Sequence, residues 1–201
     1  MAGRPREFDR DAALASARDL FWERGYEGVS ISDLIERLGL ASARIYAAFG
    51  SKEDLFREAI KHYENGEGGF VDRAFAEEPT VVGSIERMFR DAIDLYTRRT
   101  GPRGCMVVLS ATNCAKENGM LCDWLASHRR LRTASIAKKI RQGIDTGELP
   151  PDLDSDVLGD LYATALHGIA IQAKDGISRK RLSAFIPSLL CLLMPRRNLS
   201  G

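Results

Sequence analysis

The sequence contains no long hydrophobic run. No stretch of its 201 residues approaches the roughly 18 apolar residues that a membrane-spanning helix needs. The longest candidate, residues 182–194, is interrupted by Pro187 and by polar side chains. The N-terminus also lacks the basic and then apolar pattern of an export signal, because Asp9, Asp11 and Asp19 interrupt it. We therefore expect a soluble protein of the cytoplasm with no membrane partner.

An excess of one charge sign is also missing. Lysine and arginine together number 29 against 28 aspartates and glutamates, which leaves a formal net charge of +1. A protein that bound nucleic acid through bulk charge alone would be far more basic. Any contact with DNA must therefore depend on a local arrangement of cations. The hydrophobic content of 44% is enough for a substantial core.

Cysteines are few and show no CxxC spacing: Cys105, Cys114, Cys122 and Cys191. Because no export signal is visible, we expect all four to be reduced thiols. A cysteine nucleophile, Cys105 or Cys114, paired with His128 or His167 would indicate an enzyme, but no local catalytic signature accompanies these residues. The spacing of a metal site is missing as well. We therefore expect no enzyme, no metal site and no cofactor.

The sequence does contain strong helical periodicity. Apolar residues recur with the period of an α-helix, and no segment shows the convincing alternation of a β-strand. The expected helices span residues 9–24, 30–38, 41–48, 51–63, 70–76, 81–98, 105–117, 120–143, 154–174 and 179–194. Pro187 must stand near the start of the last helix or kink it. The predicted fold class is all-α.

Local signals define the ends of the first helices most clearly. Ser30 with Asp33, and Ser51 with Asp54, have the spacing of capping boxes, in which each side chain bonds a free backbone N–H. Gly39 is expected to end the second helix, because glycine enters the left-handed conformation without steric cost. The sequence thus predicts two short helices joined by a tight turn.

Two short helices joined in this way are typical of a helix-turn-helix, provided that the second helix exposes a face that fits the DNA major groove. That face would combine small residues with one cation and one phenol: Ser42, Ala43, Arg44, Tyr46 and Ala47. An arginine can donate two parallel hydrogen bonds to guanine or one to a phosphate. The spacing alone is equally consistent with an ordinary helical corner.

The complete pattern of the first sixty residues is more specific. It reads Phe21-x-x-x-Gly25-Tyr26, then Ser30-Ile31-x-x-Leu34-Ile35-x-x-Leu38-Gly39-Leu40, then Ile45-Tyr46-x-x-Phe49-x-Ser51-Lys52-x-x-Leu55. This pattern closely resembles the DNA-binding domain of the TetR/AcrR transcription regulators. The resemblance implies about nine helices, with a DNA-binding domain at residues 1–62 and an effector-binding and dimerisation domain at residues 63–201.

The resemblance also implies roles for single residues. By position, Ser42, Ala43 and Arg44 match the segment that reads base edges. Tyr46 and Lys52 match phosphate contacts, and Ser30 matches the residue that opens the helix before the turn. Two departures stand out, because Ala41 occupies a place where the family often has a capping Ser or Thr, and Arg44 replaces a small hydroxyl residue. Ser42 is therefore a candidate for the cap, and Arg44 for an extra base or phosphate contact.

Two further basic stretches have open interpretations. Arg4 and Arg6 form a short arm before the first helix, which either enters the adjacent minor groove or is an unattached terminus. The second stretch contains Arg129, Arg130, Arg132, Lys138, Lys139 and Arg141. We interpret it as a solvated helix face, with entry of an anionic ligand as the alternative.

The C-terminal part mixes many aromatic and sulfur residues with a few polar ones, as a small-molecule site requires. The expected effector-binding residues are Phe89, Tyr96, Asn113, Trp124 and His167. The alternative for each of them is ordinary core packing. The predicted function is a repressor that a small molecule releases from a palindromic operator. A regulator that senses oxidation through Cys105 or Cys114 is the alternative.

A homodimer is expected because a single helix-turn-helix contacts little DNA, and specific affinity usually needs two half-sites. The resemblance implies an interface made by the last two helices. The expected interface residues are Leu158, Leu161, Tyr162, Ala165, Ile169, Phe185, Leu189 and Leu193. The alternative is that these helices bury the same faces within one subunit.

Overall fold

The computed structural model describes residues 8–110 and 115–194, and over these ranges the chain is entirely helical apart from turns and loops. The expected all-α class is confirmed. The α-helices of the described ranges are α1 (Arg10–Arg24), α2 (Ile31–Leu38), α3 (Ser42–Phe49), α4 (Lys52–Asn65), α5 (Phe70–Glu77), α6 (Val81–Tyr96), α7 (Met106–Leu109), α8 (Gly119–Asp145), α9 (Ser155–Lys174), α10 (Arg179–Ser183) and α11 (Ile186–Leu190).

Two expected helices differ from the observed ones. The final helix is divided into α10 and α11, with Pro187 in the first turn of α11. Proline has no N–H to donate, so it is tolerated at the start of a helix but not inside one. The helix expected over residues 105–117 is limited to the short α7, followed after a gap in the described residues by a single 3₁₀ turn at Lys116–Asn118.

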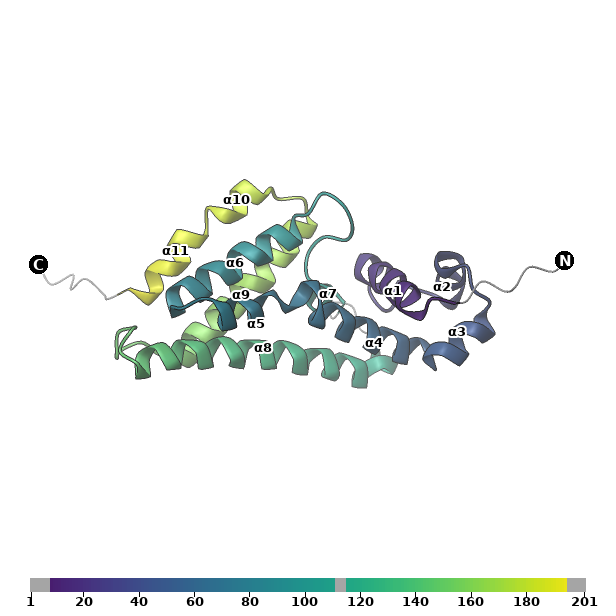
Figure 1. Cartoon of the computed structure of the whole chain (residues 1–201), viewed down its shortest axis with the longest axis horizontal. Helices are drawn as coiled ribbons and strands as arrows, with labels where there is room; N and C mark the ends of the chain where they lie inside the picture. Colours follow the sequence, from purple (N-terminus) through teal and green to yellow (C-terminus); the bar gives the residue numbers. More distant parts are fainter. Residues whose placement is uncertain (1–7, 111–114, 195–201) are drawn as a thin grey trace, which may run out of the picture.

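The first four helices form one end of the elongated molecule, next to the N-terminus (Figure 1). Their core is a cluster of three aromatic rings, in which Phe56 contacts both Phe21 and Tyr26 at centroid distances of 5.1 Å. Phe21 and Phe56 are fully buried. This cluster fixes α1 against α4 and leaves α2 and α3 at the tip (Figure 1).

The remaining helices form a bundle that extends to the C-terminus (Figure 1). The long helix α8 packs closely against α9 at Gly159, where an added Cβ would lie 2.7 Å from Ala137 Cβ. On the other side α9 packs against α6 through Phe89 and Tyr162, whose buried rings meet edge to face at 5.7 Å. Small residues at one contact and aromatic rings at the other therefore set the position of α9.

The two ends share a continuous core. The buried Trp22 of α1 donates a hydrogen bond through Nε1 to the Gly104 carbonyl at 3.1 Å and packs edge to face on Tyr63 of α4 at 4.6 Å. Residue 62, where the sequence predicts the domain boundary, lies inside α4. This helix therefore runs from the tip of the molecule into the bundle. None of the helices in the described ranges is both long and apolar enough to cross a membrane.

Candidate nucleic-acid interface and ligand cavity

The helix-turn-helix is formed by α2 and α3. The predicted capping box at the start of α2 is confirmed, since Asp33 N donates to Ser30 Oγ at 3.1 Å and Ser30 N donates to Asp33 Oδ2 at 2.8 Å. The hydrogen bonds from Ser30 hold the pKa of Asp33 below its usual value. Gly39 ends the helix at φ +65°, in the left-handed region as expected. Ser51 and Asp54 form the second predicted box, at the start of α4.

Helix α3 is half buried along its length. Ile45 and Phe49 face the core, whereas Ala43, Arg44, Tyr46 and Ala47 are exposed. Ser42 is partly exposed and is the first residue of the helix. The idea that Ser42 replaces the missing cap is wrong, because the N-cap is Ala41 and its methyl group accepts no hydrogen bond. The predicted base-reading residues thus lie together on the outer face of one short helix.

Aromatic rings position the cations beside α3. The Arg44 guanidinium lies 5.4 Å from the centre of the Phe8 ring, and the Lys52 ammonium lies 4.1 Å from the centre of the Tyr26 ring. Partial burial lowers the pKa of Lys52. Phe8 itself packs edge to face on Phe49 at 6.3 Å, so the chain enters α1 alongside α3. Arg4 and Arg6 lie outside the described residues.

A second anchor for α3 is Arg10, and no local sequence signal indicates it. Its guanidinium forms two hydrogen bonds to the Glu58 carboxylate, at 2.6 and 2.7 Å, and donates to the Ala48 carbonyl at 3.3 Å. It also lies 4.6 Å from the centre of the Phe49 ring. Arg10 therefore ties the end of α3 to α1 and α4, and so fixes the orientation of the exposed face.

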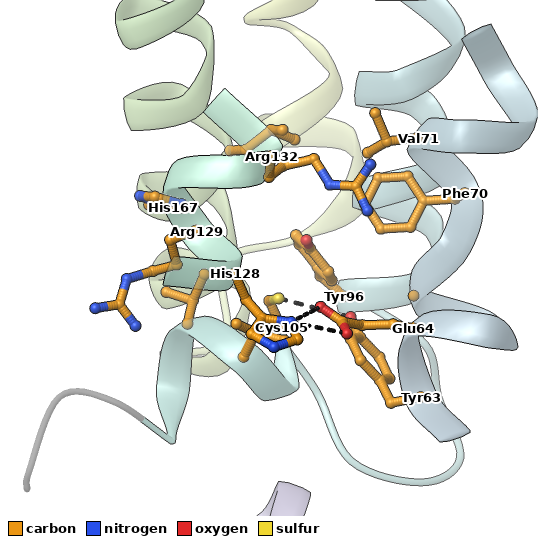
Figure 2. A pocket seen from close by; sticks show the side chains of 14 residues that line it. Tyr63, Glu64, Phe70, Val71, Tyr96, Cys105, His128, Arg129, Arg132 and His167 are labelled. Carbon is orange, nitrogen blue, oxygen red and sulfur yellow. Dashed lines mark hydrogen bonds and ion pairs between the residues drawn. The ribbon is translucent and has the colours of Figure 1, made fainter. Parts of the chain in front are cut away.

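A cavity of about 50 Å³ lies where α4 meets the bundle (Figure 2). Helices α4, α5, α6, α8 and α9 and the segment around α7 all contribute to its wall. The lining residues are Tyr63, Glu64, Gly68, Phe70, Val71, Tyr96, Cys105, Val107, Val108, His128, Arg129, Arg132, Leu166 and His167. Typical small-molecule sites measure at least about 300 Å³, so a ligand larger than a few atoms has to push these helices apart.

The polar groups of the cavity are largely paired with each other. The His128 Nδ1 atom lies 2.8 and 2.9 Å from the two Glu64 carboxylate oxygens, and the Tyr63 hydroxyl donates to Cys105 Sγ at 3.6 Å (Figure 2). Burial raises the pKa of Tyr63 and of Tyr96 well above the usual value. Both hydroxyls therefore remain protonated, and the Tyr63 hydroxyl is already used as a donor to Cys105.

Two of the five expected effector-binding residues, Tyr96 and His167, line this cavity. Phe89 does not, because its ring is buried between α6 and α9. Trp124 does not either: its ring covers His128 at 4.3 Å and stacks with the Arg57 guanidinium at 4.6 Å. Asn113 lies outside the described residues. The sequence interpretation missed Tyr63, and it placed Arg129 and Arg132 on a solvated face although both line the cavity.

The expected interface residues fall into two groups. Leu161 and Phe185 are exposed, and Ala165 and Leu189 are partly exposed. The other group packs inside the subunit and consists of Leu158, Tyr162, Ile169 and Leu193. These four residues follow the alternative of burial within one subunit, since α9 packs this side against α6, α8 and α11. The Tyr162 hydroxyl, for example, donates to the Leu189 carbonyl at 2.9 Å.

Cysteine chemistry differs between positions. Cys105 and Cys191 are free thiols. Cys122 is disulfide-bonded, so the expectation of a reduced thiol is wrong for this residue. Cys114 lies outside the described residues. Within residues 8–110 and 115–194, no group of three or more histidine, cysteine, aspartate or glutamate side chains is arranged to hold a metal ion.

Comparison with known proteins places both ends of the chain in one family. Residues 13–59 match the family of bacterial regulatory proteins named after TetR, and residues 82–184 match the tetracyclin repressor-like C-terminal domain. The transcriptional repressor ComR of Escherichia coli K12 is 32% identical over 90% of this chain and 86% of its own length. The repressor BdcR of the same strain is 31% identical over 53% of this chain and 54% of its own length.

A solved structure extends this similarity to the whole fold. A cysteine-substituted variant of the TetR family regulator CifR, complexed with a 26-bp double-strand operator DNA, is 38% identical to this chain. The two structures superpose with a TM-score of 0.90 over 96% of this chain and all of that chain. The chain therefore belongs to the TetR family of bacterial transcription regulators.

Proposed function

We propose that the chain is a homodimeric repressor that binds a palindromic operator through α3 and leaves it when a small molecule occupies the cavity. The observation that carries this proposal is the outer face of α3. Tyr46 is 47% exposed on a helix whose opposite side is fully packed, and small residues around it permit close approach to DNA. The 26-bp operator bound to CifR is long enough for two half-sites one helical turn or more apart.

We assign the DNA contacts by position on this face. Ser42, Ala43 and Arg44 read base edges, whereas Tyr46 and Lys52 bind phosphates and fix the register. Ser30 holds α2 in place by capping it, and Arg4 and Arg6 extend toward the minor groove. In this proposal residues 1–62 form the DNA-binding domain and residues 63–201 the effector-binding and dimerisation domain.

The dimer interface is proposed to lie on the outer side of α9 and α11. Large apolar side chains are exposed on α9 and directly before α11: Val157, Leu161, Ile171 and Phe185. A shallow groove between the two helices is bordered by Ala165, Ile169 and Leu189. Exposed apolar surface that forms a patch marks interaction sites in soluble proteins. The buried Leu158, Tyr162 and Leu193 would support this surface from beneath.

Control by a ligand follows from the course of α4. The helix begins with Lys52 beside α3 and reaches the cavity at Tyr63 and Glu64. A ligand that widens the cavity displaces one end of α4 relative to α8 and α9, and this changes the distance between the two α3 helices of the dimer. Release requires that the ligand bind the displaced state more tightly.

We propose that the protein has no catalytic activity. We also propose that it is located in the cytoplasm, where bacterial DNA lies.

Thiol sensing is the second candidate mechanism. The free thiol of Cys105 lines the cavity and accepts the hydrogen bond of Tyr63, so a reaction at its sulfur would alter the same wall that a ligand would occupy. The variant Cys105→Ser separates the two mechanisms. Release by a small molecule that persists in this variant excludes sensing through Cys105, and loss of release supports it.

The proposed function is tested by selecting bound sequences from random duplex DNA with the purified protein at physiological salt. We expect enrichment of a palindromic or nearly palindromic motif. A well-folded dimer that enriches no motif would contradict the proposal.

A further inference from the structure

Trp124 of α8 lies just outside the cavity and contacts both halves of the molecule. Its ring meets the His128 ring at a centroid distance of 4.3 Å and lies 4.6 Å from the Arg57 guanidinium. His128 lines the cavity and is paired with Glu64. Trp124 therefore touches a residue of the cavity wall on one side and a residue of the proposed DNA-binding domain on the other.

Arg57 continues this series of contacts toward α3. It belongs to the first half of α4, where its guanidinium forms an ion pair of 2.7 Å with Glu53. Glu53 directly follows Lys52, to which we assign a phosphate contact. A guanidinium over an indole is attracted by the negative face of the ring, and indole is the strongest aromatic partner for a cation. A displacement of Trp124 would therefore act on the start of α4.

A second contact joins the start of α8 to the same end of the molecule. The Glu27 carboxylate, shortly after α1, accepts hydrogen bonds from Asn118 Nδ2 at 2.7 Å and from the Ala115 N–H at 3.0 Å. These bonds from Asn118 and Ala115 lower the pKa of Glu27, so its carboxylate remains charged at neutral pH. Asn118 immediately precedes α8. Helix α8 is thus joined to the proposed DNA-binding domain at its first turn and again at Trp124.

Side chains connect α4 and α8 at two levels. Glu64 and His128 meet at the cavity, as Figure 2 shows, and Arg57 and Trp124 meet closer to α3. Trp124 and His128 are one helical turn apart on α8, so their side chains are neighbours and move together with the helix. A ligand that displaces α8 from α4 at the cavity would therefore disturb both levels.

We propose that Trp124 is a positioning residue of the release mechanism, which transmits a displacement of α8 at the cavity to α4 through the Arg57 guanidinium. This inference rests on the proposed function and adds a second route to it, along α8 to the start of α4, besides the continuous course of α4 itself. A route of this kind is defined by a coupling free energy between its two ends, and double-mutant cycles measure that coupling.

The test requires no knowledge of the effector, because a larger side chain can occupy the cavity in its place. Val71→Phe and, in a separate protein, Val108→Phe introduce a ring from two different parts of the wall. Operator affinity is measured by fluorescence anisotropy with the selected operator. We expect each filled variant to bind the operator about 5- to 150-fold more weakly than the wild type, the usual size of coupling between two sites.

Trp124→Ala is then combined with each filled variant. In this background we expect the loss of operator affinity caused by filling the cavity to be about 2- to 30-fold smaller. Arg57→Gln should act in the same way, and Trp124→Phe, which keeps a ring for the guanidinium, should act less. A purely structural Trp124 would change the affinity by the same factor whether the cavity is filled or not. Met120→Ala is the matched control, because Met120 lies on the same helix but is 84% exposed, and it should leave the loss unchanged.

The outcomes separate this inference from the proposed function. Circular dichroism and sedimentation first establish that each variant is a folded dimer, and two filled variants are used so that the test stands if one does not fold. An undiminished loss in the combinations with Trp124→Ala, or an equal reduction in Met120→Ala, would overturn the inference and leave the release mechanism intact. Unchanged operator affinity in folded filled variants would instead refute the release mechanism, and the inference with it.

Discussion

The functional side chains of α3 are exposed to solvent, whereas those of the cavity are buried. Tyr46 on α3 is 47% exposed, whereas Tyr63 and Tyr96 at the cavity are 2% and 3% exposed and have raised pKa values. A residue on an exposed face needs only the right helix and register to be available to DNA. A residue at the cavity depends on how five helices pack, and it acts on DNA only through the core that joins the two ends.

The largest effect is expected from removing the contact of Trp22 that joins the two ends of the molecule. Trp22→Ala deletes a fully buried indole and should lower the free energy of unfolding by about 3–5 kcal/mol. Trp22→Phe keeps a ring but leaves the Gly104 carbonyl without its donor, and should cost less, about 1–3 kcal/mol. Urea denaturation followed by circular dichroism measures both. Two separate unfolding transitions in the wild type would show that the ends do not share one core.

A second prediction tests the outer face of the bundle, where we place the dimer interface. Leu161→Glu or Phe185→Glu places a charge on the proposed interface and should raise the dimer dissociation constant about 100-fold, as loss of an interface hot spot does. Sedimentation equilibrium measures this constant. Leu131→Glu is the control, because Leu131 is 69% exposed on α8 and should leave the dimer intact. Equal effects of all three variants would place the interface elsewhere.

Substitutions on and beside α3 sharpen the division between base and phosphate contacts. Tyr46→Phe and Lys52→Ala should weaken binding to operator and unrelated DNA alike, because phosphates carry no sequence. Arg44→Ala should cost about 1–3 kcal/mol of operator binding and relax the preference at one base pair. Fluorescence anisotropy with both duplexes distinguishes these effects. A uniform loss in all three variants would place Arg44 on a phosphate.

The two helices of the motif differ in how they begin, and paired serine variants test this difference. Ser30→Ala removes the cap of α2 and should lower the free energy of unfolding by about 1 kcal/mol. Ser42→Ala removes a side chain that caps nothing and should change it by about 0.5 kcal/mol or less. Urea denaturation of both variants supplies the values. Equal losses would show that Ser42 has a structural role.

The smallest effect is expected from His167. Burial lowers the pKa of its ring from 6.5, so the folded protein binds a proton less readily than the unfolded chain. This difference in pKa makes the free energy of unfolding depend on pH. Its stabilising contribution is fully present above about pH 6.5 and is lost as the pH falls through the folded-state pKa. His167→Gln should therefore lose less stability than the wild type between pH 7 and pH 5. Identical pH profiles of the two proteins would contradict the assignment.

The sequence predictions were more accurate for the helix-turn-helix than for the cavity. Ser30, Asp33 and Gly39 act through hydrogen bonds and backbone conformation within a few residues, so their spacing was sufficient to predict α2 and the turn. The exposed face of α3 followed from helical periodicity. The capping role of Ser42 was wrong because capping depends on which residue stands immediately before the first turn, and that residue is Ala41.

The cavity could be predicted only in part, since residue type does not tell which neighbour a side chain faces. Phe89 and Tyr96 lie on the same helix, yet one ring packs on Tyr162 and the other lines the cavity. Arg129 and Arg130 are adjacent in a basic run, and only the packing of α8 on α9 separates the cavity residue from the exposed one. The Trp22 contact with Gly104 joins positions far apart in the chain and leaves no local signal.

The central claim is that the outer face of α3 reads a specific DNA sequence. The most direct test compares, at physiological salt, the affinity of the protein for its selected operator with its affinity for a scrambled duplex of equal length. We predict a preference of at least about 1,000-fold, the usual lower range for a specific reader, and a large loss of that preference in Arg44→Ala. Equal affinity for the two duplexes, with the fold and the dimer intact, would contradict the claim.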